Sequence, residues 1–270
     1  MSLKSLMVHL DQTERTAARV DLAISIARQH RARLLGVFGQ RAHAEKVSVV
    51  ATWPSPAYIE ARESSKAAFE QATADLPGAE WRDVNRGSDA ELLRLITNLA
   101  RHTDLVIVGQ YDQQGDGFVP AELVSDVILN VGRPVLVVPY VGNFTEVGKH
   151  PLIAWNNARE AAHALNDALP LIKHCTLAHV LSIAARLEDG ESSCAEVERH
   201  LATHGIKSKT EVILVEEFGI MDLLLNRIND RGADLLVMGA HGHMGFPFEI
   251  RGAGTRHILR HMTVPVLMSN

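Results

Sequence analysis

The sequence predicts an α/β protein built around parallel β-sheet. Short apolar runs of strand length alternate with longer segments whose apolar residues recur at helical spacing. Helices of ten or more residues between strands favour parallel strands joined by right-handed crossovers. The same order of segments occurs twice along the 270 residues. These observations together predict two α/β domains in tandem.

The repeat is visible directly in the residues. Gly109 and Gly239 each end an apolar strand that begins with Asp-Leu, and they stand 130 residues apart. The segment 141–148 between the halves is polar and flanked by glycines, which is typical of a linker. The predicted domains are residues 1–142 and residues 148–270.

In the first half, apolar runs predict strands at residues 6–10, 34–38, 80–84, 105–109 and 134–138. Helical spacing predicts helices at residues 13–30, 59–74, 89–102 and 123–131. Residues 39–57 contain Pro54 and Pro56, and because prolines interrupt regular structure we expect a loop there.

The second half repeats this order. Its predicted strands are residues 152–155, 176–180, 210–214, 234–238 and 264–268. Its predicted helices are residues 158–171, 188–204, 219–231 and 256–262.

Glycines follow the fourth strand of the second half at a long, regular spacing. Two residues separate Gly239 from Gly242 and nine residues separate Gly242 from Gly252, with Gly254 just beyond. Glycine removes side chains where a backbone must turn or come close to another group. The unpaired N–H groups and the dipole of a helix N-terminus attract anions. This strand–loop–helix junction therefore predicts an anion site.

The spacing of these glycines, with the closing strand 264–268, resembles the nucleotide-binding loop of the universal stress protein family. The resemblance implies two tandem five-stranded parallel sheets with helices on both faces, of the adenine-nucleotide alpha-hydrolase-like, Rossmann-like kind. It also implies that strands 134–138 and 264–268 meet at a pseudo-twofold axis. The family's loop usually continues with serine or threonine, whereas this chain has Ala253, and Thr255 is the candidate substitute.

The resemblance further implies an adenine nucleotide (ATP, ADP or AMP), with Mg²⁺ as an optional companion, in the C-terminal half. Val180 and Met238 would pack on the base, and backbone amides at the glycines would reach the phosphates. Asn156 replaces a family aspartate near the adenine and ribose, and His241, when protonated, would contact a phosphate. The implied site residues are Ala154, Asn156, Val180, Met238, Gly239, His241, Gly242, Gly252, Ala253, Gly254 and Thr255.

The N-terminal half is expected to have lost this site. Asp112 and Glu122 stand where the other half has Gly242 and Gly252. A carboxylate about 4 Å from a phosphate charge costs on the order of 4 kcal/mol at an effective dielectric near 20. Asp11 keeps an acidic residue after the first strand, and we expect it to serve the following helix N-terminus.

Composition and motifs exclude several classes of protein. A formal charge of −5 argues against binding nucleic acid. With no leader-like segment and no apolar run near 18 residues, we expect a cytoplasmic chain that does not enter a membrane. Cys175 and Cys194 are expected to be packing or surface residues. His241 with His243, and His257 with His261, are candidate zinc ligands by spacing, but no carboxylate or cysteine completes a set, so no metal site is predicted.

The favoured hypothesis is a nucleotide-binding stress or signalling protein, acting through an unidentified protein partner and able to dimerise. The chain lacks GxxxxGK[ST] and a general base beside its glycine loop, so no catalytic residue is predicted and ATP hydrolysis should be slow at most. A pyrophosphatase-type ligase would need a Ser-Gly-Gly loop, which is absent after both first strands. A scaffold that binds no nucleotide, acting through dimerisation or another cavity ligand, remains the alternative.

Overall fold

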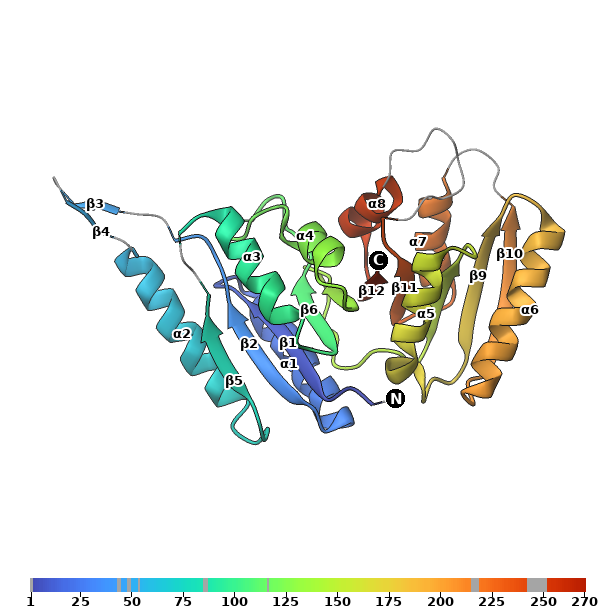
Figure 1. Cartoon of the computed structure of the whole chain (residues 1–270), viewed down its shortest axis with the longest axis horizontal. Helices are drawn as coiled ribbons and strands as arrows, with labels where there is room; N and C mark the ends of the chain where they lie inside the picture. The colour runs from blue at the N-terminus through green and yellow to red at the C-terminus, as the bar shows by residue number, and fades with distance from the viewer. Residues whose placement is uncertain are drawn as a thin grey trace. The chain divides into compact units, whose positions relative to one another are not determined.

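The computed structural model confirms the α/β class and divides the chain into two compact units (Figure 1). We call residues 3–133 the N-terminal unit and residues 134–270 the C-terminal unit. The structure describes residues 2–42, 45–47, 50–52, 54–84, 87–115, 117–214, 219–241 and 252–270.

The N-terminal unit is a parallel sheet with helices on both faces. Its sheet strands are β1 (Ser5–Leu10), β2 (Arg33–Phe38), β5 (Glu80–Asp83) and β6 (Leu105–Gly109). Its helices are α1 (Arg15–His30), α2 (Pro56–Ala72), α3 (Asp89–Ala100) and α4 (Leu123–Asn130). The strand order is β6-β1-β2-β5, and each neighbouring pair is parallel.

The chirality of the crossovers decides which helices share a face. The chain steps from β1 to β2 to β5 in one direction and then returns to β6. Because such crossovers are right-handed, α1 and α2 cover one face, while α3 and α4 cover the other. The contacts agree, since α1 touches α2 and α3 touches α4. Figure 1 shows α3 and α4 in front of the strands and α1 behind them.

The expected loop at residues 39–57 is in part regular structure. A small antiparallel hairpin is formed by β3 (Glu45–Val47) and β4 (Val50–Thr52). Helix α2 begins at Pro56, because proline suits the first helical position, where its missing N–H is not needed. The hydroxyl of Ser55 accepts a hydrogen bond from the Tyr58 N–H at 3.2 Å and caps the helix. The loop prediction was therefore wrong for these residues.

The C-terminal unit has the same strand order. Its strands are β7 (Val135–Val138), β8 (Pro151–Trp155), β9 (Ala178–Ala184), β10 (Ser208–Leu214), β11 (Leu235–Gly239) and β12 (Val266–Ser269). Its helices are α5 (Arg159–Ile172), α6 (Leu187–Thr203), α7 (Ile220–Asp230) and α8 (Ala253–His261). The order β11-β8-β9-β10 matches β6-β1-β2-β5 of the other unit, and all these neighbours are parallel. No helix in the described parts of the chain has the length and apolar character needed to cross a membrane.

Strand β9 is longer than predicted. It runs to Ala184 rather than ending near Val180, because neighbouring strands continue to pair with it beyond Val180. Ser182 lies opposite Trp155 of β8, and Ala184 lies opposite Leu214 of β10. The extension is thus held by pairing with β8 as far as Ser182 and with β10 as far as Ala184, which periodicity in the sequence does not reveal.

The two closing strands pair with each other, as predicted. β7 and β12 are antiparallel within the C-terminal unit, with Val137 opposite Val266 and Val135 opposite Met268. Both strands are buried along their length. An antiparallel pair of equivalent strands has local twofold symmetry, and the pairing removes an edge that would otherwise be open to aggregation.

Candidate functional site

The predicted site lies where the chain of the C-terminal unit changes direction. β8 and β11 are parallel neighbours, but the chain leaves β8 through α5 on one face and leaves β11 toward α8 on the other. In open α/β sheets, ligands bind beyond the carboxyl ends of the strands at such a point. The segments that follow β8 and β11, with the start of α8, therefore form the candidate site.

Two of the predicted glycines are in close contact with protein. A Cβ added to Gly239 would lie 2.6 Å from the carbonyl carbon of Glu160 and 2.7 Å from the backbone nitrogen of Ala161. A Cβ at Gly254 would lie 3.2 Å from the sulfur of Met221 in α7. Gly239 thus allows α5 to pack directly on β11, which is a structural reason for glycine at this position.

A hydrogen bond joins the residue after β11 to the first turn of α8, at the two ends of the glycine loop. The His241 N–H donates to the Thr255 hydroxyl at 2.9 Å, and both residues are buried. A Cβ on Gly252 would lie 2.6 Å from Nδ1 of His241, so the imidazole is seated directly on this glycine. Gly252 has φ +80° and His241 has φ +56°, both in the left-handed region. Gly242 lies outside the described residues.

The start of α8 has the features of an anion site. Gly252 is its N-cap, and in this described helix no side chain caps the first turn and no acidic residue lies in it. The first N–H groups of a helix have no intrahelical acceptor. A Cβ at Gly252 would lie 3.4 Å from Nη1 of Arg256, so a guanidinium stands beside these groups. Sequence reasoning missed Arg256, although a basic residue in a first turn, where acids are preferred, is an available signal.

The remaining predicted residues lie on three neighbouring strands and the start of α8. Ala154 is half-buried near the end of β8, and Asn156 follows that strand and accepts the Ala158 N–H through Oδ1 at 3.2 Å. Met238 is 7 % exposed at the end of β11, beside Gly239. Val180 is 1 % exposed and pairs with Ile153 in mid-strand, before the carboxyl end of β9. Ala253 is half-buried as the first residue of α8.

The histidines of α8 are engaged within the protein. Nε2 of His257 lies 2.9 Å from Oδ1 of Asp222 in α7, and His261 Nδ1 lies 2.9 Å from the His257 carbonyl oxygen. Among the residues that the structure describes, histidine, cysteine, aspartate and glutamate do not gather in groups of three or more that could hold a metal ion.

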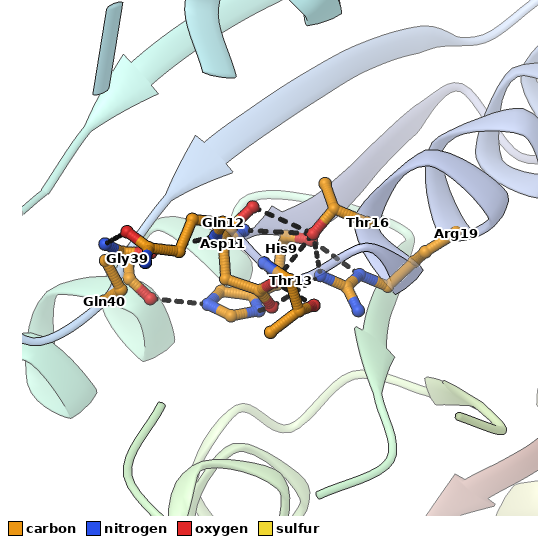
Figure 2. A network of polar contacts seen from close by, with 8 residues as sticks. All are labelled: His9, Asp11, Gln12, Thr13, Thr16, Arg19, Gly39 and Gln40. Atoms are coloured by element: carbon orange, nitrogen blue, oxygen red, sulfur yellow. Dashed lines mark hydrogen bonds and ion pairs between the residues drawn. The ribbon is translucent and has the colours of Figure 1, made fainter. Parts of the chain in front are cut away.

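The equivalent place in the N-terminal unit is filled by a buried ion pair. Nη2 of Arg19 in α1 donates to Oδ2 of Asp11 at 2.7 Å, and its Nε donates to the His9 carbonyl oxygen at 2.8 Å. Arg19 is 3 % exposed and Asp11 is 6 % exposed. A Cβ on Gly109 would lie 2.2 Å from Nη1 of Arg19, so the guanidinium lies against the end of β6. Figure 2 shows these side chains converging beyond the end of β1.

Hydroxyl groups and a backbone N–H provide the remaining hydrogen bonds to the Asp11 carboxylate. Oδ1 accepts hydrogen bonds from the Thr16 hydroxyl at 2.7 Å, from the Thr13 hydroxyl and from the Thr13 N–H at 2.9 Å. The N-cap of α1 is Glu14, so the predicted role of Asp11 at the helix N-terminus is replaced by its pairing with Arg19. Burial alone would raise the pKa of Asp11, but the Arg19 cation, His9 and the hydroxyls outweigh burial and hold the pKa below its usual range.

His9 is buried beside this ion pair as a neutral ring. Its Nε2 donates to the Gly39 carbonyl oxygen at 2.7 Å, and its Nδ1 lies 3.7 Å from Oδ2 of Asp11. Burial lowers the pKa of His9 to about 4, with Asp11 acting in the opposite direction and Arg19 in the same one. Next to it, Gln12 and Gln40 are joined by two hydrogen bonds, of 2.9 and 2.7 Å.

The depressed pKa of His9 makes the stability of the fold depend on pH. The unfolded chain protonates this histidine near pH 6.5, whereas the folded chain does so near pH 4. The stability that His9 contributes is thus present above pH 6.5 and is lost as pH falls toward 4. A pKa difference corresponds to about 1.4 kcal/mol per pH unit. Between pH 6.5 and pH 4, the free energy of unfolding of His9→Gln should therefore fall by about 3 kcal/mol less than that of the unmodified chain. Urea unfolding at several pH values measures this, and parallel pH curves for the two chains would contradict it.

The two loops that follow β6 and β11 differ in charge at equivalent positions. Glu122 is the N-cap of α4, as Gly252 is of α8. Asp112 accepts the Gln114 N–H at 2.9 Å within its own turn. The N-terminal unit thus combines carboxylates in this loop with a guanidinium that occupies the end of the sheet.

Comparisons with known proteins identify related sequences and related folds. The family model of the universal stress protein family matches residues 152–270. A universal stress protein of Synechocystis sp. is 24% identical over 189 residues, which cover 65% of this chain and 61% of that protein, so the match spans less than two thirds of the relative.

Solved structures show that the fold of the whole chain is shared. A universal stress protein of Archaeoglobus fulgidus DSM 4304 covers 98% of both chains with a TM-score of 0.69 at 14% identity. A protein of Pseudomonas aeruginosa UCBPP-PA14 covers 99% of this chain and 93% of its own, with a TM-score of 0.63 at 17% identity. Residues 152–270 of this chain thus match the model of the universal stress protein family, and the whole chain shares its fold with a solved universal stress protein.

Proposed function

We propose that the C-terminal domain binds an adenine nucleotide, with its phosphates at the start of α8, and that occupancy alters an interaction with a protein partner in a stress response. The observation that carries the proposal is the first turn of α8. It begins at a glycine, contains no acidic residue and has the Arg256 guanidinium beside it. The match of residues 152–270 to the universal stress protein family supports the same reading.

The chemistry of this turn suits a polyphosphate. Backbone N–H groups and the positive end of the helix dipole favour an anion, and Gly252 allows close approach. Arg256 adds a permanent positive charge with several donors. No nucleophile or general base is assigned, so the proposed role is binding, with at most slow hydrolysis, and Mg²⁺ would bind through the phosphates.

The base and ribose would lie over the ends of β8 and β11. Ala154, Asn156 and Met238 surround this part of the site. Oδ1 of Asn156 already accepts a backbone N–H, so its amide group remains as a donor. A neutral amide here removes the charge that the family's aspartate would provide, which should weaken a contact with the ribose hydroxyls.

The proposal can be tested by mass spectrometry of the heat-denatured purified protein. Release of an adenine nucleotide would support it. If no nucleotide is released and millimolar ATP with magnesium does not raise the melting temperature, the alternative of a scaffold without nucleotide is correct. If a nucleotide is bound, calorimetric titration with ATP, ADP and AMP would identify which one binds most tightly.

Arg256→Gln is expected to weaken ATP binding by roughly tenfold to a hundredfold, since a charge-assisted contact contributes about 1.5–3 kcal/mol. The loss should shrink from ATP to ADP to AMP, and adenosine binding should not change. Arg260→Gln, in the last turn of the same helix, is the matched control and should leave all four affinities unchanged. Equal losses for ATP and adenosine would show that Arg256 does not contact phosphate.

A further inference from the structure

A cavity lies in the N-terminal unit, between α1 and α2. Its volume is about 370 Å³. This falls within the roughly 300–1,000 Å³ that is typical of small-molecule sites. The floor consists of Leu10, Val20 and Phe69, which are all 5 % exposed or less. The cavity is thus an apolar trough on the helical face of the sheet.

The trough exists because α2 presents small side chains toward α1. The α2 residues that line it, apart from the floor, are Ala61, Ser64, Ser65, Ala68 and Ala72. Gly36 of β2 deepens it further, since a Cβ there would lie 2.7 Å from Cε2 of Phe69 and 2.9 Å from Cδ1 of Leu10. The Phe69 ring therefore packs directly on Gly36 of the sheet.

The charged residues that line the trough are all acidic. Asp11, Glu14 and Asp21 line it, and none of its lining residues within the described chain is lysine, arginine or histidine. Asp11 is compensated by Arg19, whereas Glu14 and Asp21 stand at the exposed rim. The dipole at the start of α1 would favour an anion, but Glu14 is the N-cap there and supplies a negative charge itself.

We infer that this trough binds a small, largely apolar molecule that carries a cationic amine. The apolar part lies over Leu10, Val20 and Phe69, and the ammonium lies at the rim between Glu14 and Asp21. Such a ligand complements the trough in both shape and charge. The carboxylates of the trough repel the phosphates of a nucleotide. The trough also lies in the N-terminal unit, so this site is independent of the one proposed in the C-terminal unit.

Three molecules with the same eight-carbon chain test the class of ligand. n-Octylammonium, octan-1-ol and octanoate have a cationic, a neutral and an anionic head group, respectively. Titrations of the full chain are followed by amide chemical shifts in NMR spectra. Octylammonium is expected to bind about tenfold or more tightly than octanoate, with shifts confined to α1, α2 and the segment 10–14. Equal or tighter binding of octanoate, shifts elsewhere, or no binding at millimolar concentration would overturn the inference.

A matched pair of variants tests the location. Ala68 lines the trough and Ala67 does not, while both are exposed on α2. Ala68→Phe should fill the space and weaken octylammonium binding by about tenfold or more, while Ala67→Phe should change it less than about twofold. Unchanged binding in Ala68→Phe would refute the site.

A charge variant keeps the inference testable if Ala68→Phe fails to fold. Glu14→Gln with Asp21→Asn alters only exposed side chains and should weaken octylammonium binding by about fivefold, as expected for two solvent-screened charges. Octan-1-ol binding should stay the same in this variant. If octylammonium and octan-1-ol respond equally, the carboxylates do not recognise the amine and the assigned ligand class is wrong.

Discussion

Replacing Arg19 by methionine is expected to lower the free energy of unfolding by about 3–5 kcal/mol, because it leaves a buried carboxylate without its counter-charge. Methionine fills much of the same volume but cannot donate to Asp11 or to the His9 carbonyl oxygen. Asp11 would keep only its hydroxyl and backbone donors. Urea unfolding near pH 7 measures the loss directly.

The pH dependence of this loss identifies its cause. In the unmodified chain the pKa of Asp11 lies below its usual range, so its stabilising effect is present at neutral pH and is lost only in strong acid. Without Arg19, burial should raise the pKa of Asp11 instead, so the variant regains stability as pH falls and the carboxyl becomes neutral. The difference between the two chains should therefore narrow below pH 5.

Two further variants separate the ion pair from side-chain packing. Arg62→Met removes an exposed pair with Glu63 and should cost no more than about 1 kcal/mol. Asp11→Asn combined with Arg19→Met removes both charges and should recover part of the loss seen in Arg19→Met alone. If Arg19→Met lies within about 1 kcal/mol of the unmodified chain, Arg19 is not the partner that stabilises Asp11.

Gly252→Asp is expected to reduce nucleotide binding by roughly a hundredfold to a thousandfold. It copies the acidic residue that the N-terminal unit carries at Glu122, the N-cap of α4. A carboxylate about 4 Å from a phosphate costs on the order of 4 kcal/mol at an effective dielectric near 20. Calorimetric titration with ATP measures the change in affinity.

Gly252→Asn separates charge from shape. Asparagine has the same size as aspartate and tolerates the left-handed conformation at φ +80°, but both side chains meet the His241 ring. The neutral variant should therefore bind ATP much more tightly than the acidic one. Gly232→Asp, at the end of α7 with φ +57° and open space around it, controls for added charge and should not alter binding. Equal affinities for Gly252→Asp and Gly252→Asn would show that no phosphate lies near the N-terminus of α8.

The two units show two outcomes for the same strand order. In the N-terminal unit the end of the sheet is occupied by Arg19, which is held by Asp11 and by the His9 carbonyl oxygen. In the C-terminal unit the residue that follows β8 is Asn156, and α8 begins at a glycine with Arg256 nearby. An internal guanidinium thus occupies the end of the sheet in the N-terminal unit, at the place that corresponds to the candidate site of the C-terminal unit.

The sheet could be predicted because buried parallel strands have a strong signature. Leu105–Gly109 and Leu235–Gly239 are apolar runs of strand length, and both are strands in the structure. The extension of β9 to Ala184 could not be predicted, since its end is stabilised by pairing with a strand about 30 residues further along the chain. The start of α2 at Pro56 was missed because proline was read as a break instead of a first helical residue.

The sequence indicated where glycines allow the backbone to turn or approach closely, but it did not indicate which charged residues lie nearby. The glycines marked the loop and the start of α8, because glycine signals positive φ or close approach, as Gly252 and Gly239 show. Arg19 was missed, since arginine in an amphipathic helix normally faces solvent, and its partner Asp11 lies in a different element. The cavity between α1 and α2 depends on Gly36 and small residues of α2 coming together in space, which a single sequence does not show.

A crystal structure of the full chain grown with an excess of a non-hydrolysable ATP analogue tests the central claim most directly. The account predicts one nucleotide per chain, with its phosphates at the start of α8 near Gly252 and Arg256. It also predicts that the Asp11–Arg19 pair of the N-terminal unit stays intact. A nucleotide that displaces Arg19 at the end of β6, or an ordered nucleotide away from residues 239–256, would contradict the account.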